Sequence, residues 1–377
     1  ISESGKDTLS LYIHIPFCSS RCIYCGFFST TNLNQRERYT AALCQELKMR
    51  CKELQEEKIT TIYFGGGTPS LLSPQQLKLI FNTIEDCFNV SEVQEITLEC
   101  NPDDISHTFL NNLKELPINR ISMGIQSFND ETLHFLKRRH NSIQAINAVK
   151  NCKDAGYNNI SIDLIYGIPG QNSEDFKSDI ETAVSLDVTH ISSYHLSYEE
   201  ETPIWQMLIN KKIDSIDEEE SVQMYNILCD TLKGNDFNHY EISNFAKNGF
   251  ESKHNSSYWN GVPYLGVGAG AHSFDGDTRR WNPDNLNEYI EGIELGHTVY
   301  EEEHLTLADK HNEAIMLGLR KQEGISLSNF KNRFGEKLYN LLLSNTETQI
   351  KSGTLIKERD RIRISEHGLF ISDNIIS

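Results

Sequence analysis

Three cysteines near the start of the chain point most directly to chemistry. Cys18, Cys22 and Cys25 have the spacing C-x3-C-x2-C and follow the apolar segment 11–15. Three thiolates this close in sequence can surround one metal centre, but they leave a tetrahedral zinc site one ligand short. They suit a four-iron cluster in which the fourth iron stays open for a small molecule. Three unrelated thiols, or a zinc site completed by His14, are the alternatives.

Six apolar segments that alternate with helical segments are expected to position this loop. The expected strands cover residues 9–15, 59–64, 95–99, 120–124, 159–165 and 190–194. Strands and helices that alternate at this spacing indicate parallel βα units. Polar or glycine-rich motifs follow the strands, so we predict an α/β fold, a partial TIM-like (β/α)6 barrel with its site at the carboxyl ends of the strands. A doubly wound open sheet is the alternative.

Composition divides the chain into three parts. Residues 1–235 hold the predicted barrel, and residues 236–304 form a connecting region that is rich in glycine, asparagine and aromatic residues. Residues 305–377 contain helical stretches and two short strands, which predict a small winged-helix-like α+β domain. Because a fold alone does not determine function, we interpret this domain as a cap or packing module.

Composition also restricts the class of protein. Hydrophobic residues make up 38% and charged residues 24% of the 377 residues, an ordinary globular mixture. The net charge of −19 argues against a nucleic-acid partner, because phosphate binding needs a basic surface. No apolar run approaches the roughly 20 residues of a membrane helix, and the first ten residues show no targeting pattern. Nine cysteines without a regular framework favour the reducing cytosol, so we predict a cytoplasmic protein.

The cysteine motif after the first barrel strand resembles the radical S-adenosylmethionine (SAM) superfamily. In that family the amino and carboxylate groups of SAM chelate the open iron, and an electron from the cluster cleaves SAM to a 5′-deoxyadenosyl radical. The Gly-Gly-Gly-Thr-Pro segment at 65–69 resembles the glycine motif of the family, whose backbone binds the methionine end of SAM. Glycines there permit a close backbone approach. Taken alone, this segment would be read as an ordinary βα loop.

Further motifs resemble the branch that contains oxygen-independent coproporphyrinogen III dehydrogenase. They lie at 12–18, 65–69, 99–102, 124–128, 138–140 and 163–169. The resemblance implies a [4Fe-4S] cluster on the three cysteines. It also implies SAM contacts from Tyr12, Tyr24 (through its backbone), Gly66, Gly67, Thr68, Glu99, Gln126, Arg138 and Asp163. Carboxylates can accept from ammonium or ribose groups and arginine can pair with a carboxylate, although each could instead make a salt bridge at the barrel mouth.

Two features separate the chain from the dehydrogenase. In that enzyme a fourth cysteine follows two residues after the third, whereas Phe27 stands here. Because the cysteine motif begins within the first twenty residues given, we also expect the substrate-handling N-terminal extension of the enzyme to be absent, unless residues precede this sequence. The segment His254-Asn255-Ser256-Ser257-Tyr258-Trp259 matches the H-N-x-x-Y-W signature of the HemW-type haem chaperone branch.

This second resemblance implies that haem binds at the segment around His254. The imidazole of His254 is a candidate iron ligand, and Asn255 could orient it through a hydrogen bond. Tyr258 and Trp259 offer flat apolar surface to a porphyrin. A histidine-capped loop with two core aromatic residues is the alternative, and His272 is the main rival ligand.

We therefore predict a haem chaperone, which is a binding and transfer protein, and we assign it no catalytic residue. It would carry a SAM-bound [4Fe-4S] cluster with a structural or switching role and pass haem to acceptor haemoproteins such as respiratory enzymes. A homodimer and a peripheral membrane contact are both compatible with this prediction. The alternatives are a radical SAM coproporphyrinogen III dehydrogenase and a radical SAM enzyme for another substrate.

Overall fold

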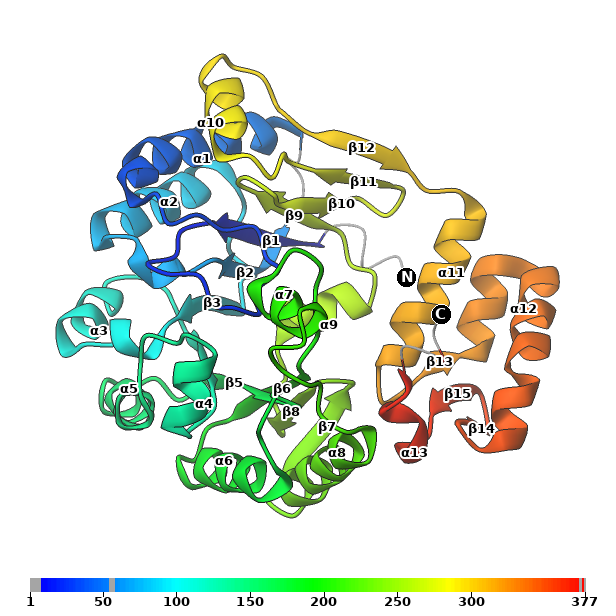
Figure 1. Ribbon diagram of the computed structural model, residues 1–377. Coiled ribbons are helices and arrows are strands. Elements are labelled where there is room, and N and C mark those ends of the chain that lie inside the picture. Colours follow the sequence, from blue (N-terminus) through cyan, green and yellow to red (C-terminus); the bar gives the residue numbers. More distant parts are fainter. Residues whose placement is uncertain (1–7, 54–57, 373–374, 376–377) are drawn as a thin grey trace.

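The computed structural model describes residues 8–53, 58–372 and 375, and shows a barrel-like α/β domain with a smaller domain beside it (Figure 1). The ends of the predicted first and third parts, residues 1–7 and 376–377, lie outside the described residues. None of the described helices is both long and apolar enough to cross a membrane.

Six parallel strands form the centre of one sheet, and each pairs with the next along the chain. They are β1 (Thr8–Ile15), β2 (Lys58–Gly66), β3 (Glu95–Cys100), β4 (Arg120–Gln126), β5 (Ile160–Tyr166) and β6 (His190–His195). Their helices are α1 (Arg36–Arg50), α2 (Pro74–Cys87), α3 (His107–Leu113), α4 (Asp130–Phe135), α5 (Ser142–Asp154) and α6 (Ser173–Ser185). The predicted partial (β/α)6 barrel is confirmed, and each strand end lies within two residues of its predicted position.

Residues 236–304 extend the same sheet at both edges (Figure 1). After α7 (Pro203–Ile209) and α8 (Glu218–Lys233), the hairpin of β7 (Phe237–Glu241) and β8 (Asn244–Lys247) pairs antiparallel with β6. At the other edge, β9 (Tyr264–Val267) pairs parallel with β1, and β10 (His272–Phe274), β11 (Thr278–Trp281) and β12 (Glu301–His304) follow in antiparallel order. Helices α9 (Lys253–Trp259) and α10 (Leu286–Glu294) lie between these strands in sequence. The sheet is therefore open, with β12 and β7 at its edges.

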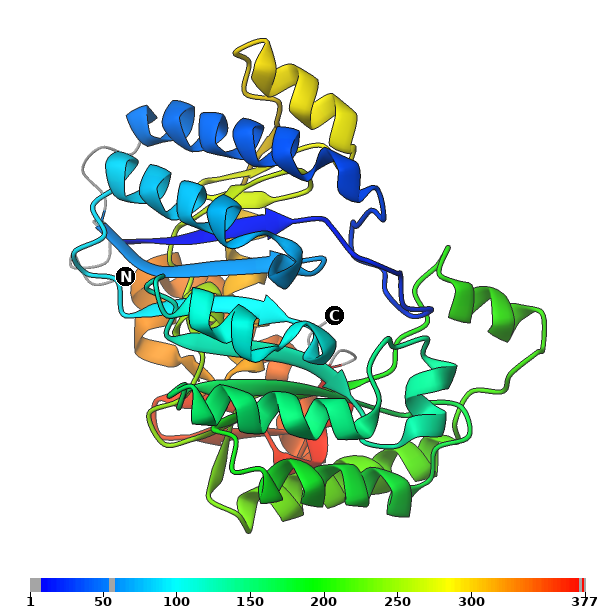
Figure 2. The ribbon, with the colours of Figure 1, turned by 90° about the vertical axis from the view of Figure 1, so that its left-hand side faces the viewer.

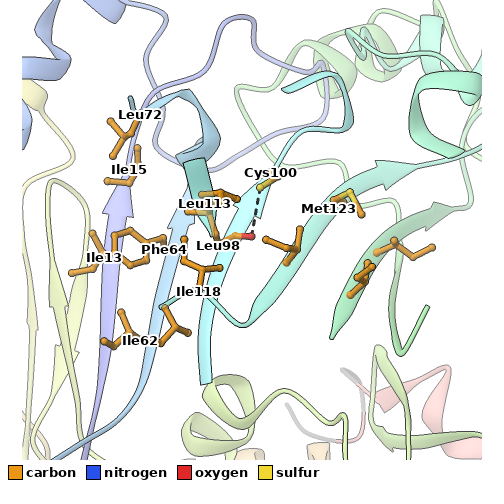
Figure 3. Close-up of a cluster of buried hydrophobic side chains, with 14 of the residues drawn as sticks. Ile13, Ile15, Ile62, Phe64, Leu72, Leu98, Cys100, Leu113, Ile118 and Met123 are labelled. Carbon is orange, nitrogen blue, oxygen red and sulfur yellow. Dashed lines mark hydrogen bonds between the residues drawn. The ribbon is translucent and has the colours of Figure 1, made fainter. Parts of the chain in front are cut away.

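Alternation along β1 separates the core from the inner face of the sheet. Leu11, Ile13 and Ile15 are fully buried in the core with residues of α1 and α2, because alternate strand residues point to one face. Figure 3 shows part of this core, which continues through Phe64 and Leu98 on the next two strands. The residues between them, such as Tyr12 and His14, point to the opposite, concave face of the sheet.

The C-terminal domain has its own small sheet and core. It contains α11 (Leu307–Arg320), β13 (Ile325–Ser326), α12 (Leu327–Ser352), β14 (Leu355–Glu358), β15 (Arg361–Ile364) and α13 (Glu366–Leu369). Helix α12 bends at Gly335, whose φ of 79° is not helical. Backbone hydrogen bonds from Ile242 to Arg320 and from Gln322 to Tyr240 attach the domain to the β7–β8 hairpin.

Candidate functional site

The three motif cysteines lie on the loop after β1 and line one cavity at the carboxyl ends of the barrel strands. We call this space the cysteine cavity. Eight of the nine residues predicted to contact SAM line it as well: Tyr24, Gly66, Gly67, Thr68, Glu99, Gln126, Arg138 and Asp163. Tyr12, the ninth, lines a neighbouring cavity instead. The structure therefore brings together residues from five consecutive strand ends.

A small apolar cluster holds the cysteine loop in place. Ile23, between the second and third cysteines, is 3% exposed and packs in a cluster with Leu136, Ile165 and Ile204. Its backbone N–H donates to Leu136 O at 3.4 Å, and its carbonyl accepts from the N–H of Ile204 at 3.0 Å. Figure 2 shows the loop, in blue, extending past the strand ends toward the green segment that carries α7. The loop is thus anchored to elements on the far side of the barrel mouth.

The glycine motif packs directly against the cysteine loop. The N–H of Gly67 donates to Ile15 O at 2.8 Å, and a Cβ at Gly67 would lie 2.7 Å from Phe17 O. Gly66 has a φ of 107°, and a Cβ there would lie 2.5 Å from the His14 ring. The hydroxyl of Thr68 donates to Cys18 Sγ at 3.6 Å. Only glycine permits this approach, because both positions lack room for a side chain.

Arg138 places a positive charge beside the thiols. Its Nη1 donates to Cys22 Sγ at 3.2 Å, and its Nη2 donates to Asn101 Oδ1 at 2.8 Å. Its buried Nε has no partner among the described residues. Burial raises the pKa values of the Cys18 and Cys25 thiols in the chain without metal. Bound iron would favour the thiolate forms of the cysteines, and the positive guanidinium of Arg138 also stabilises a negative charge on Cys22.

Two half-buried carboxyl groups face the same cavity. Burial raises the pKa of Glu99 to about 7, while a hydrogen bond from Tyr63 at 2.7 Å lowers it and the charge of Asp163 raises it further. Burial likewise raises the pKa of Asp163 to about 6. Gln126 follows an irregularity in β4 and has a φ of 73°, which is uncommon for a residue with a side chain. A cationic ligand would stabilise both carboxylates.

These residues fit a [4Fe-4S] cluster with a ligand at its open iron. The three loop thiols line one cavity together with carboxyl, amide and backbone groups. Cys100 of β3 lines it too, but its side chain is buried and its thiol donates to Leu98 O at 3.8 Å. His14 does not complete a zinc site here, because its ring nitrogens lie 3.1 Å from the Tyr12 hydroxyl and 3.2 Å from Phe28 O. It lines the neighbouring cavity.

That neighbouring cavity, the aromatic cavity, measures about 890 Å³. Residues of β9–β11, helix α9 and helix α11 contribute to its lining. Its aromatic lining includes Tyr258, Trp259, Tyr264, Phe274 and Trp281. Phe27, which is 71% exposed, lines both cavities, so the two spaces meet at this residue.

The first half of the H-N-x-x-Y-W segment supports the barrel interior. His254 is 1% exposed, with its Nδ1 2.8 Å from Thr61 Oγ1 and its Nε2 2.8 Å from the Tyr258 hydroxyl. Its backbone N–H donates to Glu95 at 3.0 Å. Burial, and then the charge of Arg120, lowers the pKa of His254 to about 3. Neither ring nitrogen is available to iron in this arrangement, which does not favour the predicted ligand role.

The second half of the segment reaches the aromatic cavity. Tyr258 and Trp259 line it, and the guanidinium of Arg320 lies 4.8 Å from the Trp259 ring centre. Asn255 does not line the cavity, and its backbone N–H donates to the Ser252 cap of α9. The expectation that Asn255 orients the imidazole of His254 finds no contact in the described residues.

Several lining residues were not predicted from the sequence. Phe274, Arg279 and Trp281 belong to strands of three or four residues, too short for a clear period. Alternation of large side chains at 272, 274, 279 and 281 is the signal that could have placed them on one face. His272, the rival ligand, does line this cavity, and burial, then Arg279, lowers its pKa and favours the neutral imidazole.

Comparisons with known proteins define the family. The family model for the radical SAM superfamily matches residues 12–183, and the model for the HemN C-terminal domain matches residues 305–371. The chain is 36% identical to the haem chaperone HemW of Lactococcus lactis over 97% of this chain and 96% of that protein. The HemW of Bacillus subtilis is 34% identical, with 97% of each chain covered.

The chain belongs to the HemW family. This HemW family member is also 30% identical to the mitochondrial radical S-adenosyl methionine domain-containing protein 1 of Danio rerio, over 97% of this chain and 86% of that protein. The solved structure of coproporphyrinogen III oxidase (HemN) from Escherichia coli covers 100% of this chain and 90% of its own, with a TM-score of 0.86 and 22% identity. At that identity the likeness shows a shared fold.

Proposed function

We propose that this chain is a haem chaperone, which binds haem and passes it to acceptor haemoproteins. The aromatic cavity is the observation that carries the proposal. Its volume of about 890 Å³ lies within the roughly 300–1,000 Å³ of typical ligand sites. A haem is flat and largely apolar with two carboxylates at one edge, and the flat aromatic surface of the cavity suits its ring. The charged residues that line the cavity are Arg279, Asp284, Glu288, Glu301 and Glu313, of which the arginine can pair with a carboxylate. Membership of the HemW family, whose relatives carry the name haem chaperone, supports the same function.

We further propose that Cys18, Cys22 and Cys25 hold a [4Fe-4S] cluster with SAM at its open iron. When bound, the cluster supplies an electron that can cleave SAM. Within the chain, Arg138 places its positive charge beside Cys22. The glycine motif lets the end of β2 approach the cysteine loop closely. Seven side chains or backbone groups of the cysteine cavity besides Arg138 remain proposed SAM contacts. Tyr12 has less support, because it lines the other cavity and bonds to His14.

A radical SAM coproporphyrinogen III dehydrogenase is the second candidate. The contact of both cavities at Phe27 favours it, since a substrate in the aromatic cavity would lie beside the cluster. Phe27 also argues against it, because the sequence resemblance places a fourth cysteine at that position in the enzyme. We therefore propose a transfer role without a catalytic residue, with the cluster acting as a structural element or a switch.

One anaerobic preparation can test both candidates. The protein is reconstituted with iron and sulfide, then assayed for haem uptake, haem transfer to an apo-haemoprotein, and coproporphyrinogen III conversion with SAM. Saturable haem uptake followed by transfer, without vinyl product, is expected. Vinyl product with SAM turnover and no transfer would establish the enzyme instead.

The acceptor is proposed to be a haemoprotein such as a respiratory enzyme, reached by peripheral contact with a membrane. A homodimer and a cytosolic location are also proposals. All nine cysteines are free thiols, which is compatible with a reducing compartment.

A further inference from the structure

Among the residues that the structure describes, the histidines that line the aromatic cavity are His14 and His272. An iron ligand must offer a ring nitrogen with an unused lone pair and an open approach. His14 is 6% exposed, and its ring nitrogens are taken by the Tyr12 hydroxyl and Phe28 O. In the described part of the chain no hydrogen bond reaches either ring nitrogen of His272, and its side chain is exposed to the cavity.

The strand pairing places His272 among the residues that suit a porphyrin. His272 on β10 pairs with Trp281 on β11, and Phe274 pairs with Arg279 and with Tyr264 on β9. Directly paired residues point to the same face of a sheet, and all five line the aromatic cavity. The ring planes of His272 and Trp281 are stacked, with centres 6.3 Å apart and an angle of 28°. The indole thus limits the orientations of the imidazole.

The same face carries a partner for a carboxylate. Arg279 is the arginine that lines the cavity, and it pairs with Glu313 of α11, which also lines it. Its side chain keeps 38% of its surface exposed, so it is accessible to a second carboxylate. A propionate offers the same two oxygens as the glutamate and can take its place in a guanidinium pair.

We propose that His272 binds the iron of haem in the aromatic cavity, with the porphyrin between the inner face of β9–β11 and α11 and one propionate on Arg279. This inference rests on the proposed haem-binding function and assigns its ligand to β10 rather than to the H-N-x-x-Y-W segment. In this arrangement His254 is a positioning residue, since it orients Tyr258 at the cavity wall.

Spectroscopy of haem-loaded variants tests this assignment. The wild-type chain, His272→Ala, His272→Met, His254→Ala and the control His297→Ala are titrated with haem after cluster reconstitution. His297 is exposed and lies outside the cavity. Optical, resonance Raman and EPR spectra report the axial ligand, and circular dichroism with iron content reports folding.

We expect an imidazole-ligand signature in the wild type and in His297→Ala. His272→Ala should lose this signature and bind haem at least about ten-fold more weakly, and added imidazole should restore it. His272→Met should give a thioether-type signature instead. The fraction of His254→Ala that folds should keep the imidazole signature.

The outcomes separate this assignment from the proposed function. A wild-type chain that binds no haem would refute the haem chaperone proposal itself. A wild-type chain that binds haem while His272→Ala and His272→Met keep its full imidazole signature would overturn the assignment alone. Loss of the signature in a folded His254→Ala sample, with His272→Ala unchanged, would return the ligand to α9.

Discussion

Burial sets the protonation of the individual carboxyl groups that line the cysteine cavity. Glu99 on β3 and Asp163 on β5 both line this cavity, and burial raises their pKa values to about 7 and about 6. Both carboxyl groups therefore carry protons more readily than in an unfolded chain. The polar inner face of the barrel is costly to ionise until a cation or a hydrogen-bonding ligand enters.

The free energy of unfolding should consequently fall as pH rises, because these two groups lose their protons. A pKa raised in the folded state means that the folded chain binds the proton more tightly, so stability is lost as pH rises from about 4.5 to about 7. Glu99→Gln should remove roughly 1–3 kcal/mol of this loss, as measured by denaturant unfolding across that window. The exposed control Glu85→Gln should follow the wild type. Parallel pH curves for wild type and Glu99→Gln would count against the raised pKa.

The three motif cysteines should differ from the other thiols in iron content. Cys18→Ser, Cys22→Ser and Cys25→Ser should each lose most of the bound iron after reconstitution, because each removes one of three cluster ligands. Cys87→Ser is the matched control, since Cys87 is also half-buried but lies at the end of α2. Iron and sulfide assays give the readout. Full clusters in all three variants would exclude the ligand assignment.

At the scale of elements, the end of β2 determines how closely the cysteine loop packs against the sheet. Gly67→Ala should reduce cluster content several-fold, because a Cβ 2.7 Å from Phe17 O must push the loop away. Gly26→Ala serves as the control within the same loop. A Cβ there meets only the side chain of Glu199, at 3.3 Å. Iron content equal to the wild type in Gly67→Ala would show that the contact is not limiting.

Helix α9 acts as a support for the barrel interior. His254→Ala removes the hydrogen bonds of the imidazole to the Thr61 and Tyr258 hydroxyls, and among the described residues Thr61 then keeps only its bond to Ser10. We expect a loss of roughly 2–4 kcal/mol in the free energy of unfolding. Denaturant titration of His254→Ala, with His297→Ala as the control variant, measures this free energy. A variant as stable as the wild type would contradict the supporting role.

Some of these elements could be predicted from the sequence and others could not. Most of the strands β1–β6 could be predicted because they are short segments rich in β-branched and other apolar residues, and they alternate with helical segments. Their order then brings the predicted SAM residues to one barrel mouth. The position of His254 could not be predicted, since its partners Thr61 and Glu95 lie 193 and 159 residues away. The same holds for β9, whose Tyr264 pairs with Ser10 at the other end of the chain.

At the scale of the whole molecule, the aromatic cavity links the two domains. One wall belongs to the barrel sheet, and the other carries Glu313, Met316 and Leu317 of α11 from the C-terminal domain. Met316 is 37% exposed, and apolar surface on this helix faces the space a ligand would fill. The domain that the sequence suggests as a cap therefore contributes directly to the proposed haem site.

Haem should therefore order α11 more than the outer part of the same domain. A ligand that contacts both walls adds stability only to the state in which they are together, so opening of the domains becomes rarer. Hydrogen–deuterium exchange of Leu307–Arg320 should slow on haem addition, whereas the β14–β15 hairpin, outside the cavity, should change little. SAM without haem should leave α11 unchanged, because its proposed contacts all lie on the barrel. Protection confined to the barrel strands, with α11 exchanging as before, would place haem away from the interdomain wall.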